Sequence, residues 1–93
     1  MISYGRQSID ESDINEVILA LKSDWLTTGP LVELFEAELQ NFVGAPCISV
    51  SSGTAALHLA LLAIGVKKND LVIVPNLTFI ATANVVKYTG AEP

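Results

Sequence analysis

A short polar segment, Ser51-Ser52-Gly53-Thr54, stands between a strand-like run and an apolar helix pattern. The first amides of a helix have no partners within the helix, and the helix dipole makes that end positive. Gly53 lets a ligand approach the backbone closely, and the hydroxyls of Ser52 and Thr54 add hydrogen-bonding groups. The segment can therefore form a phosphate-binding turn. An ordinary strand-to-helix turn, capped by a serine or threonine, fits the same residues equally well.

The aromatic residue Phe79 closes a second segment of interest, residues 75–79, which follows a strand-like run at 71–74. Ligands of open α/β sheets bind at the carboxyl ends of the strands, so we expect this segment near Gly53. An aromatic ring there can lie flat against a planar cofactor. A core residue at the start of a helix is the other interpretation of Phe79, and the local pattern alone favours it.

The segment 23–30 shows neither a helix nor a strand period and contains the only tryptophan, Trp25. Together with Tyr4, this loop offers aromatic and hydroxyl groups that suit a sugar or a nucleotide base. A loop that serves only packing explains the same residues, and the local pattern leaves both interpretations open.

Other chemistry is not indicated. His58 has no acidic or cysteine partner at ligand spacing, so we expect no metal site. Cys47 lies on a predicted strand and is interpreted as a small core residue. The chain contains no G-x-G-x-x-G, P-loop or G-x-S-x-G motif and no local nucleophile–base pair.

Hydrophobic periodicity predicts the elements that position these residues. Asp10 is the expected N-cap of the first helix, Pro30 opens the second, and Gly44 ends it. The alternation of strands and helices predicts an α/β fold with a mainly parallel sheet and right-handed crossovers. The predicted helices cover about 11–22, 30–43, 54–64 and 80–88, and the predicted strands cover 47–50 and 71–74.

Burial is predicted from the same patterns. Helix 54–64 is apolar on almost every side and should be covered all round. The run 71–74 is typical of a strand covered on both faces. The second helix should bury a stripe that consists of Val32, Phe35, Leu39 and Phe42.

The composition limits the class of protein. The 93 residues are 51% hydrophobic, with a formal charge of −5, which excludes a disordered segment and gives no electrostatic footprint for nucleic acid. One cysteine rules out an internal disulfide and fits a reducing compartment. The N-terminus does not have the pattern of a signal peptide, and the longest apolar run is too short to span a bilayer. We expect a cytoplasmic protein with no nucleic-acid or membrane partner.

A set of segments lies in order along the chain: Thr27-Thr28-Gly29-Pro30, Phe35-Glu36, residues 51–61, residues 78–84 and Gly90-Ala91-Glu92-Pro93. Together these segments resemble the DegT/DnrJ/StrS aminotransferases, fold type I enzymes that use pyridoxal phosphate on nucleotide-linked keto-sugars. The match runs in order over essentially the whole chain. The opening residues 4–10 and the loop 23–30 look most like the pseudaminic-acid branch, which aminates C4 of a UDP-linked 4-keto-6-deoxy-N-acetyl-hexosamine with glutamate as donor.

The resemblance implies roles for individual residues. Gly53, Thr54 and Ala55 would hold the cofactor phosphate, and Phe79 would stack on the pyridine ring. The residues expected on the sugar-nucleotide side are Tyr4, Asp24, Trp25, Leu26, Thr27 and Gly53.

The resemblance also implies how the chain divides into an N-terminal arm and part of a larger domain. Residues 1–30 would be a helical N-terminal arm with a substrate-side loop, and residues 31–93 the first part of the large cofactor-binding domain. The family's Schiff-base lysine comes later in its members, and none of the four lysines here lies in its context. We therefore expect this chain to hold no catalytic residue, to be inactive and poorly stable alone, and to belong to a longer homodimeric enzyme.

Other interpretations remain open at this stage. Another nucleotide-sugar aminotransferase of the family, or a sugar dehydratase in which histidine replaces the lysine, fits the same segments. A non-catalytic protein that binds a cofactor or a partner without turnover is the alternative from a different class.

Overall fold

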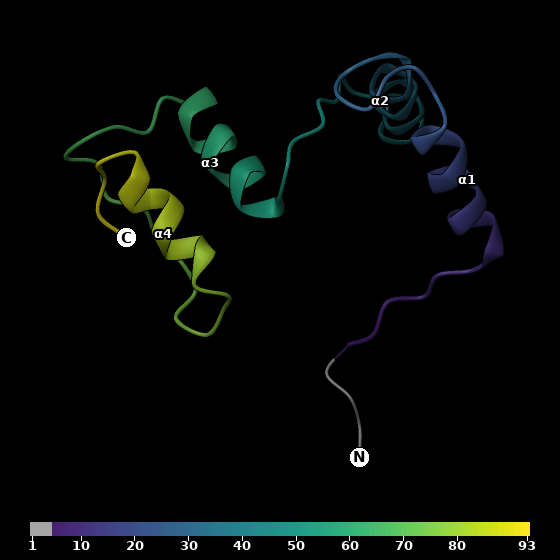
Figure 1. The fold of residues 1–93 in the computed structure, drawn as a ribbon. Helices are drawn as coiled ribbons and strands as arrows, with labels where there is room; N and C mark the ends of the chain where they lie inside the picture. Colours follow the sequence, from purple (N-terminus) through teal and green to yellow (C-terminus); the bar gives the residue numbers. More distant parts are fainter. Residues whose placement is uncertain (1–4) are drawn as a thin grey trace. The chain divides into compact units, whose positions relative to one another are not determined.

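The computed structural model describes residues 5–93, which divide into two compact units that meet in sequence between Ser49 and Val50. Figure 1 shows the helices of each unit: α1 and α2 in the first, α3 and α4 in the second. All four predicted helices are present, within about one residue of their expected ends. Their bounds are Glu11–Leu21 for α1, Pro30–Val43 for α2, Gly53–Ala63 for α3 and Ala81–Tyr88 for α4.

Asp10 caps α1, as predicted. Its carboxylate accepts the backbone N–H groups of Ser12 at 2.8 Å and Asp13 at 3.2 Å, while the Asp13 carboxylate accepts the Asp10 N–H at 3.0 Å. The Ser12 hydroxyl and the two amides favour the charged form, so the pKa of Asp10 lies below its ordinary value. This reciprocal capping fixes where α1 begins.

Two glycines and a proline define α2. Pro30 occupies its first turn, and Gly44 ends it in the left-handed region with φ 76°, where its N–H donates to the Gln40 carbonyl at 2.8 Å. Gly29 precedes the helix with φ 113°. A Cβ on Gly29 would lie 2.9 Å from the Cβ of Trp25, so no other residue fits there without movement.

The predicted apolar stripe of α2 is not buried among the described residues. Phe42 is 90% exposed, Val32 and Phe35 are also exposed, and only Leu39 is half-buried. A helix buries its apolar face only where another element covers it, and no described segment covers this one.

The second unit is held together by α3 and α4, which pack against each other. The rings of His58 on α3 and Tyr88 on α4 meet edge to face, with centroids 5.5 Å apart and planes at 73°. The buried apolar residues of the described chain are Ala81, Val85, Val86 and Ala91.

Helix α3 is less covered than its sequence predicts. None of its residues is buried, and Leu57, Leu59 and Leu62 are all exposed. No helix among the described residues is both long enough and apolar enough to cross a membrane.

The two predicted strands do not form a sheet in the described residues. Residues 47–50 have no strand partner, and residues 71–74 make a single parallel bridge, between Leu71 and Glu92. In that bridge the Glu92 N–H donates to the Asp70 carbonyl and the Val72 N–H to the Glu92 carbonyl. Strands are defined by pairing, and Glu92 is the single described residue that pairs with this run.

The burial of residues 71–74 alternates. Val72 and Val74 are half-buried and line, with residues of α3 and α4, an apolar hollow of about 210 Å³ that we call the Val72 hollow. Leu71 is exposed, and Ile73 is 101% exposed. The run is therefore extended and covered on one face, whereas the sequence predicted cover on both.

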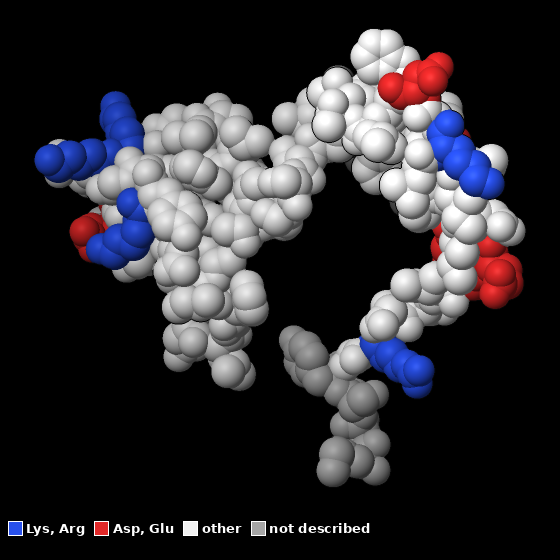
Figure 2. All heavy atoms as spheres, viewed as in Figure 1, with Lys and Arg blue, Asp and Glu red and all other residues white. Residues whose placement is uncertain are grey.

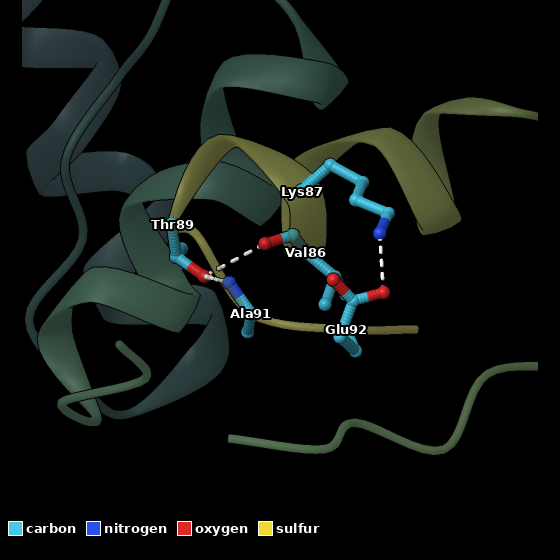
Figure 3. Close-up of polar contacts among 5 residues, drawn as sticks. All are labelled: Val86, Lys87, Thr89, Ala91 and Glu92. Carbon is cyan, nitrogen blue, oxygen red and sulfur yellow. Dashed lines mark hydrogen bonds and ion pairs between the residues drawn. The ribbon is translucent and has the colours of Figure 1, made fainter. Parts of the chain in front are cut away.

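Thr89 directs the chain from α4 back to this bridge (Figure 3). Its hydroxyl donates to the Val86 carbonyl at 2.8 Å and accepts the Ala91 N–H at 3.4 Å. Lys87 and Glu92 form an ion pair beside it, with both side chains largely exposed. These local bonds place Glu92 alongside Leu71.

Candidate functional site

The start of α3 carries two amides without partners. Ser52 is extended and caps the helix, and its hydroxyl accepts the Ala55 N–H at 3.1 Å. Its carbonyl accepts the Ala56 N–H at 3.0 Å. Within the described part of the chain, the N–H groups of Gly53 and Thr54 have no acceptor. Ser52 therefore caps α3 as an ordinary capped turn would, and two amides beside it remain free to donate.

Gly53 is open to its surroundings. A Cβ built at this position would meet nothing within 4 Å, and the residue does not lie in the left-handed region. The fold of the described chain therefore imposes no need for glycine there. A ligand that approaches the backbone would impose one.

Gly53 and Phe79 line the same hollow, of about 510 Å³, which we call the Phe79 hollow. Phe79 is 77% exposed, so its ring is not a core residue of the described structure. The full lining is Gly53, Thr54, Ala56 and Leu57 from α3, with Phe79, Ala81 and Thr82 from the start of α4. The predicted proximity of the two motifs is therefore present.

The Phe79 hollow contains no charged side chain. The second unit has no Lys, Arg, Asp or Glu in residues 50–66 or 71–86. Its charged residues are those of the turn 67–70 together with Lys87 and Glu92, and Figure 2 shows the blue and red atoms of this unit gathered at one end. An anion at Gly53 would thus be met by amides and the helix dipole of α3.

Two hydroxyls lie on the α4 side. The Oγ1 atoms of Thr78 and Thr82 are 3.3 Å apart, and either can be the donor. Thr82 is half-buried and lines both the Phe79 hollow and the Val72 hollow. The Thr78–Thr82 bond ties the turn that carries Phe79 to the first turn of α4.

The predicted sugar-side loop lies in the first unit and has its own hollow, of about 310 Å³, lined by Trp25 with residues of α1 and α2. The Ser23 hydroxyl organises it, because it donates to the Ala20 carbonyl at 2.8 Å. The Trp25 N–H donates to that hydroxyl at 3.3 Å. Trp25 is 62% exposed, which leaves its ring available to a ligand.

The other predicted sugar-side residues are less engaged. Asp24, Leu26 and Thr27 are exposed and do not line this hollow. Tyr4 lies outside the described residues. The loop and the Phe79 hollow belong to different units.

The structure adds residues that the sequence interpretation did not single out. Ala56 and Leu57 follow the predicted cup on α3, and Ala81 and Thr82 follow Phe79 on α4. Spacing could have found them, because residues three or four apart share a helix face. Among the described residues no cluster of metal-binding side chains occurs, and Cys47 is a half-buried free thiol whose sulfur contacts the Ala45 carbonyl.

Comparison with known proteins adds an independent line of evidence. The DegT/DnrJ/EryC1/StrS aminotransferase family matches residues 7–93. The chain is 44% identical to the UDP-4-amino-4,6-dideoxy-N-acetyl-beta-L-altrosamine transaminase of Campylobacter jejuni, over 99% of this chain and 24% of that protein. It is 43% identical to the UDP-4-amino-4-deoxy-L-arabinose–oxoglutarate aminotransferase of Shewanella sediminis, over 95% of this chain and 23% of that protein.

A solved structure is also similar to this chain. Spr1654 of Streptococcus pneumoniae, assigned as a sugar aminotransferase, superposes with a TM-score of 0.88 at 38% identity, over 99% of this chain and 24% of that one. It has been solved in its PLP and PMP forms.

The fold and the matched sequence define a pyridoxal-phosphate-dependent class of transferase, fold type I. The chain belongs to the DegT/DnrJ/EryC1/StrS aminotransferase family. It spans about a quarter of the length of the curated relatives that it matches.

Proposed function

We propose that the second unit forms the phosphate and ring side of a pyridoxal phosphate site in a nucleotide-sugar aminotransferase. The single observation that carries this proposal is the Phe79 hollow, which Gly53, Thr54 and Phe79 line together. The group fits these residues, because two unpaired amides suit a phosphate and an exposed ring suits a pyridine.

The phosphate would be held at the start of α3. The N–H groups of Gly53 and Thr54 are free to donate. Ala55 is the third proposed contact, but its N–H donates to the Ser52 hydroxyl. Ala55 would reach the phosphate only if the Ser52 side chain rotates away, which exchanges one capping bond for a charge-assisted one.

The ring would lie against Phe79. When bound, pyridoxal phosphate supplies an electron sink for the carbanion chemistry of amino transfer. Phe79 would orient the ring and exclude water from one of its faces.

We propose that residues 1–93 do not transaminate by themselves. No lysine lines the Phe79 hollow, since Lys67, Lys68 and Lys87 lie at the charged end of the unit and Lys22 belongs to the first unit. The amine that this chemistry needs would come from the remainder of a longer protein. That remainder would also pair with residues 47–50 and 71–74 in a mainly parallel sheet, so residues 31–93 would begin the large domain.

The substrate we propose is a UDP-linked 4-keto-6-deoxy-N-acetyl-hexosamine, aminated at C4 with glutamate as donor. The similarity to the Campylobacter jejuni transaminase supports this choice. The arm and loop of residues 1–30 would line the sugar-nucleotide side through Asp24, Trp25, Leu26 and Thr27. The whole enzyme would be a cytoplasmic homodimer with sites between its subunits.

The test uses the full-length protein, the keto-sugar and glutamate labelled with ¹⁵N. We expect a UDP-amino-sugar that carries the label at C4, detected by mass spectrometry and NMR. Loss of a hydroxyl without label incorporation would identify a dehydratase. Binding of the cofactor with no change in the sugar would identify a non-catalytic member.

A further inference from the structure

The Phe79 hollow has only two polar side chains in its lining, Thr54 and Thr82. Thr54 belongs to the second residue of α3, beside the unpaired amides that suit an anion. Thr82 comes from α4, on the other element, three residues after Phe79. The two hydroxyls therefore come from different elements of the lining: one from the start of α3, where the phosphate is proposed, and one from the element that follows Phe79.

The hydroxyl of Thr82 is not isolated. Its Oγ1 atom lies 3.3 Å from that of Thr78, and in such a pair one hydroxyl donates its hydrogen to the other. One O–H donor therefore remains. If Thr78 donates to Thr82, the spare donor belongs to the residue that lines the hollow. No group within residues 5–93 accepts that hydrogen bond.

A donor on the wall of an otherwise apolar hollow favours a ligand with a hydrogen-bond acceptor at that place. We propose that Thr82 donates a hydrogen bond to an acceptor atom on the ring portion of the cofactor, and that Thr78 orients and polarises the Thr82 hydroxyl. This inference rests on the proposed function. It assigns the Thr82 hydroxyl to the ring and not to the phosphate, which meets the start of α3.

The arrangement makes the two threonines unequal. Thr82 touches the ligand, whereas Thr78 acts through Thr82 and is a positioning residue. Hydrogen bonds in a chain strengthen one another, so removal of Thr78 should weaken the contact without abolishing it. Once Thr82 is lost, Thr78 has nothing left to orient.

The experiment measures dissociation constants of the cofactor-free full-length protein for two probes, pyridoxal 5′-phosphate and inorganic phosphate. Thr82→Val keeps the shape and removes the hydroxyl. We expect it to weaken pyridoxal phosphate binding by about 3- to 10-fold, the range of one net hydrogen bond, with phosphate binding unchanged. Thr82→Ser should retain most of the affinity. Thr78→Val should give a smaller loss, and the double variant should be no worse than Thr82→Val alone.

Thr89→Val is the matched control, because the Thr89 hydroxyl bonds only within the chain, to Val86 and Ala91. It should lower thermal stability and leave both dissociation constants unchanged. Unchanged binding in Thr82→Val, an equal loss for both probes, or additive losses in the double variant would each overturn the inference.

The outcome also separates this inference from the function on which it rests. If the wild-type protein binds pyridoxal phosphate and Gly53→Ala weakens that binding, the proposed site stands whatever Thr82→Val does. If the wild-type protein binds neither probe, the proposed function fails and this inference fails with it.

Discussion

The carboxylate of Glu36 on α2 accepts two hydrogen bonds from Ser49, one from its backbone N–H and one from its hydroxyl, each at 2.7 Å. The two residues are 13 apart in sequence, so the contact closes a loop between α2 and the predicted strand 47–50. The backbone N–H and then the hydroxyl favour the charged form, and the pKa of Glu36 therefore lies below its ordinary value.

We expect these two Glu36–Ser49 hydrogen bonds to depend on pH. Folding lowers the pKa of Glu36. The stability that the two hydrogen bonds add to the folded state is therefore present above the ordinary pKa of 4.5, and it is lost as the pH falls through the lowered pKa. We expect the Ser49 amide proton to titrate below pH 4.5 in an NMR series. Glu36→Gln should abolish this titration, and Glu38→Gln should leave it in place. A Ser49 transition at or above pH 4.5 would contradict the assignment.

We expect the substitution Gly53→Ala to have opposite effects on folding stability and on ligand binding. Since a Cβ there meets no atom of the chain and the backbone is not left-handed, Gly53→Ala should stabilise the cofactor-free full-length protein by up to about 1 kcal/mol. The same methyl would intrude on a bound phosphate, and we expect affinity for pyridoxal phosphate and for phosphate to fall about tenfold, or ~1.4 kcal/mol. Thermal melts and equilibrium titrations measure the two effects.

A matched glycine gives the control. Gly44 ends α2 in the left-handed region, so Gly44→Ala should lower stability and leave ligand binding unchanged. Full affinity in Gly53→Ala would remove the phosphate from the start of α3.

We expect the substitution Phe79→Leu to weaken binding of the cofactor ring selectively. Because the side chain is largely exposed, Phe79→Leu should change the stability of the cofactor-free protein by no more than about 0.5 kcal/mol. Loss of the aromatic contact should weaken the binding of pyridoxal phosphate by roughly 0.5–1.5 kcal/mol and leave the binding of inorganic phosphate unchanged. Phe42→Leu, at an exposed ring of the first unit, is the control and should change neither titration. Equal loss for both probes in Phe79→Leu would argue against stacking.

The small core predicts weak cooperativity for the isolated 93-residue chain. Its buried apolar residues among those described are two alanines and two valines, which cannot offset the conformational entropy of folding so many residues. We expect a broad, gradual loss of helical circular dichroism on heating, with no calorimetric peak. A sharp two-state transition would show that the chain is a self-sufficient domain.

Local signals predicted the helices well because each helix has its own start and stop. The Asp10 cap, Pro30, and the left-handed Gly44 act within one turn, so their effect is visible in the sequence. The proximity of Gly53 and Phe79 was predicted from a shared sheet edge, whereas in the described residues they meet where α3 packs against α4.

Burial was not predictable in the same way. The sequence predicts residues covered on every side, but cover depends on the segments that pack against them. Phe42 and Ile73 show this, because their patterns are those of core residues and both are nearly fully exposed. The Thr78–Thr82 bond was missed for a different reason: two hydroxyls four apart carry no strong pattern until the turn that precedes α4 is seen.

The single bridge between Leu71 and Glu92 has a consequence for how the gene can vary in length. Side chains of an extended run alternate between faces, so a slip of one residue exchanges the two sets. One codon inserted between Val72 and Val74 would turn a valine away from the Val72 hollow and bring its exposed neighbour in. An insertion in the turn before Asp70, whose carbonyl accepts the Glu92 N–H, precedes the bridge and leaves this alternation intact. Length changes are therefore expected to be tolerated at that turn and selected against within residues 71–74.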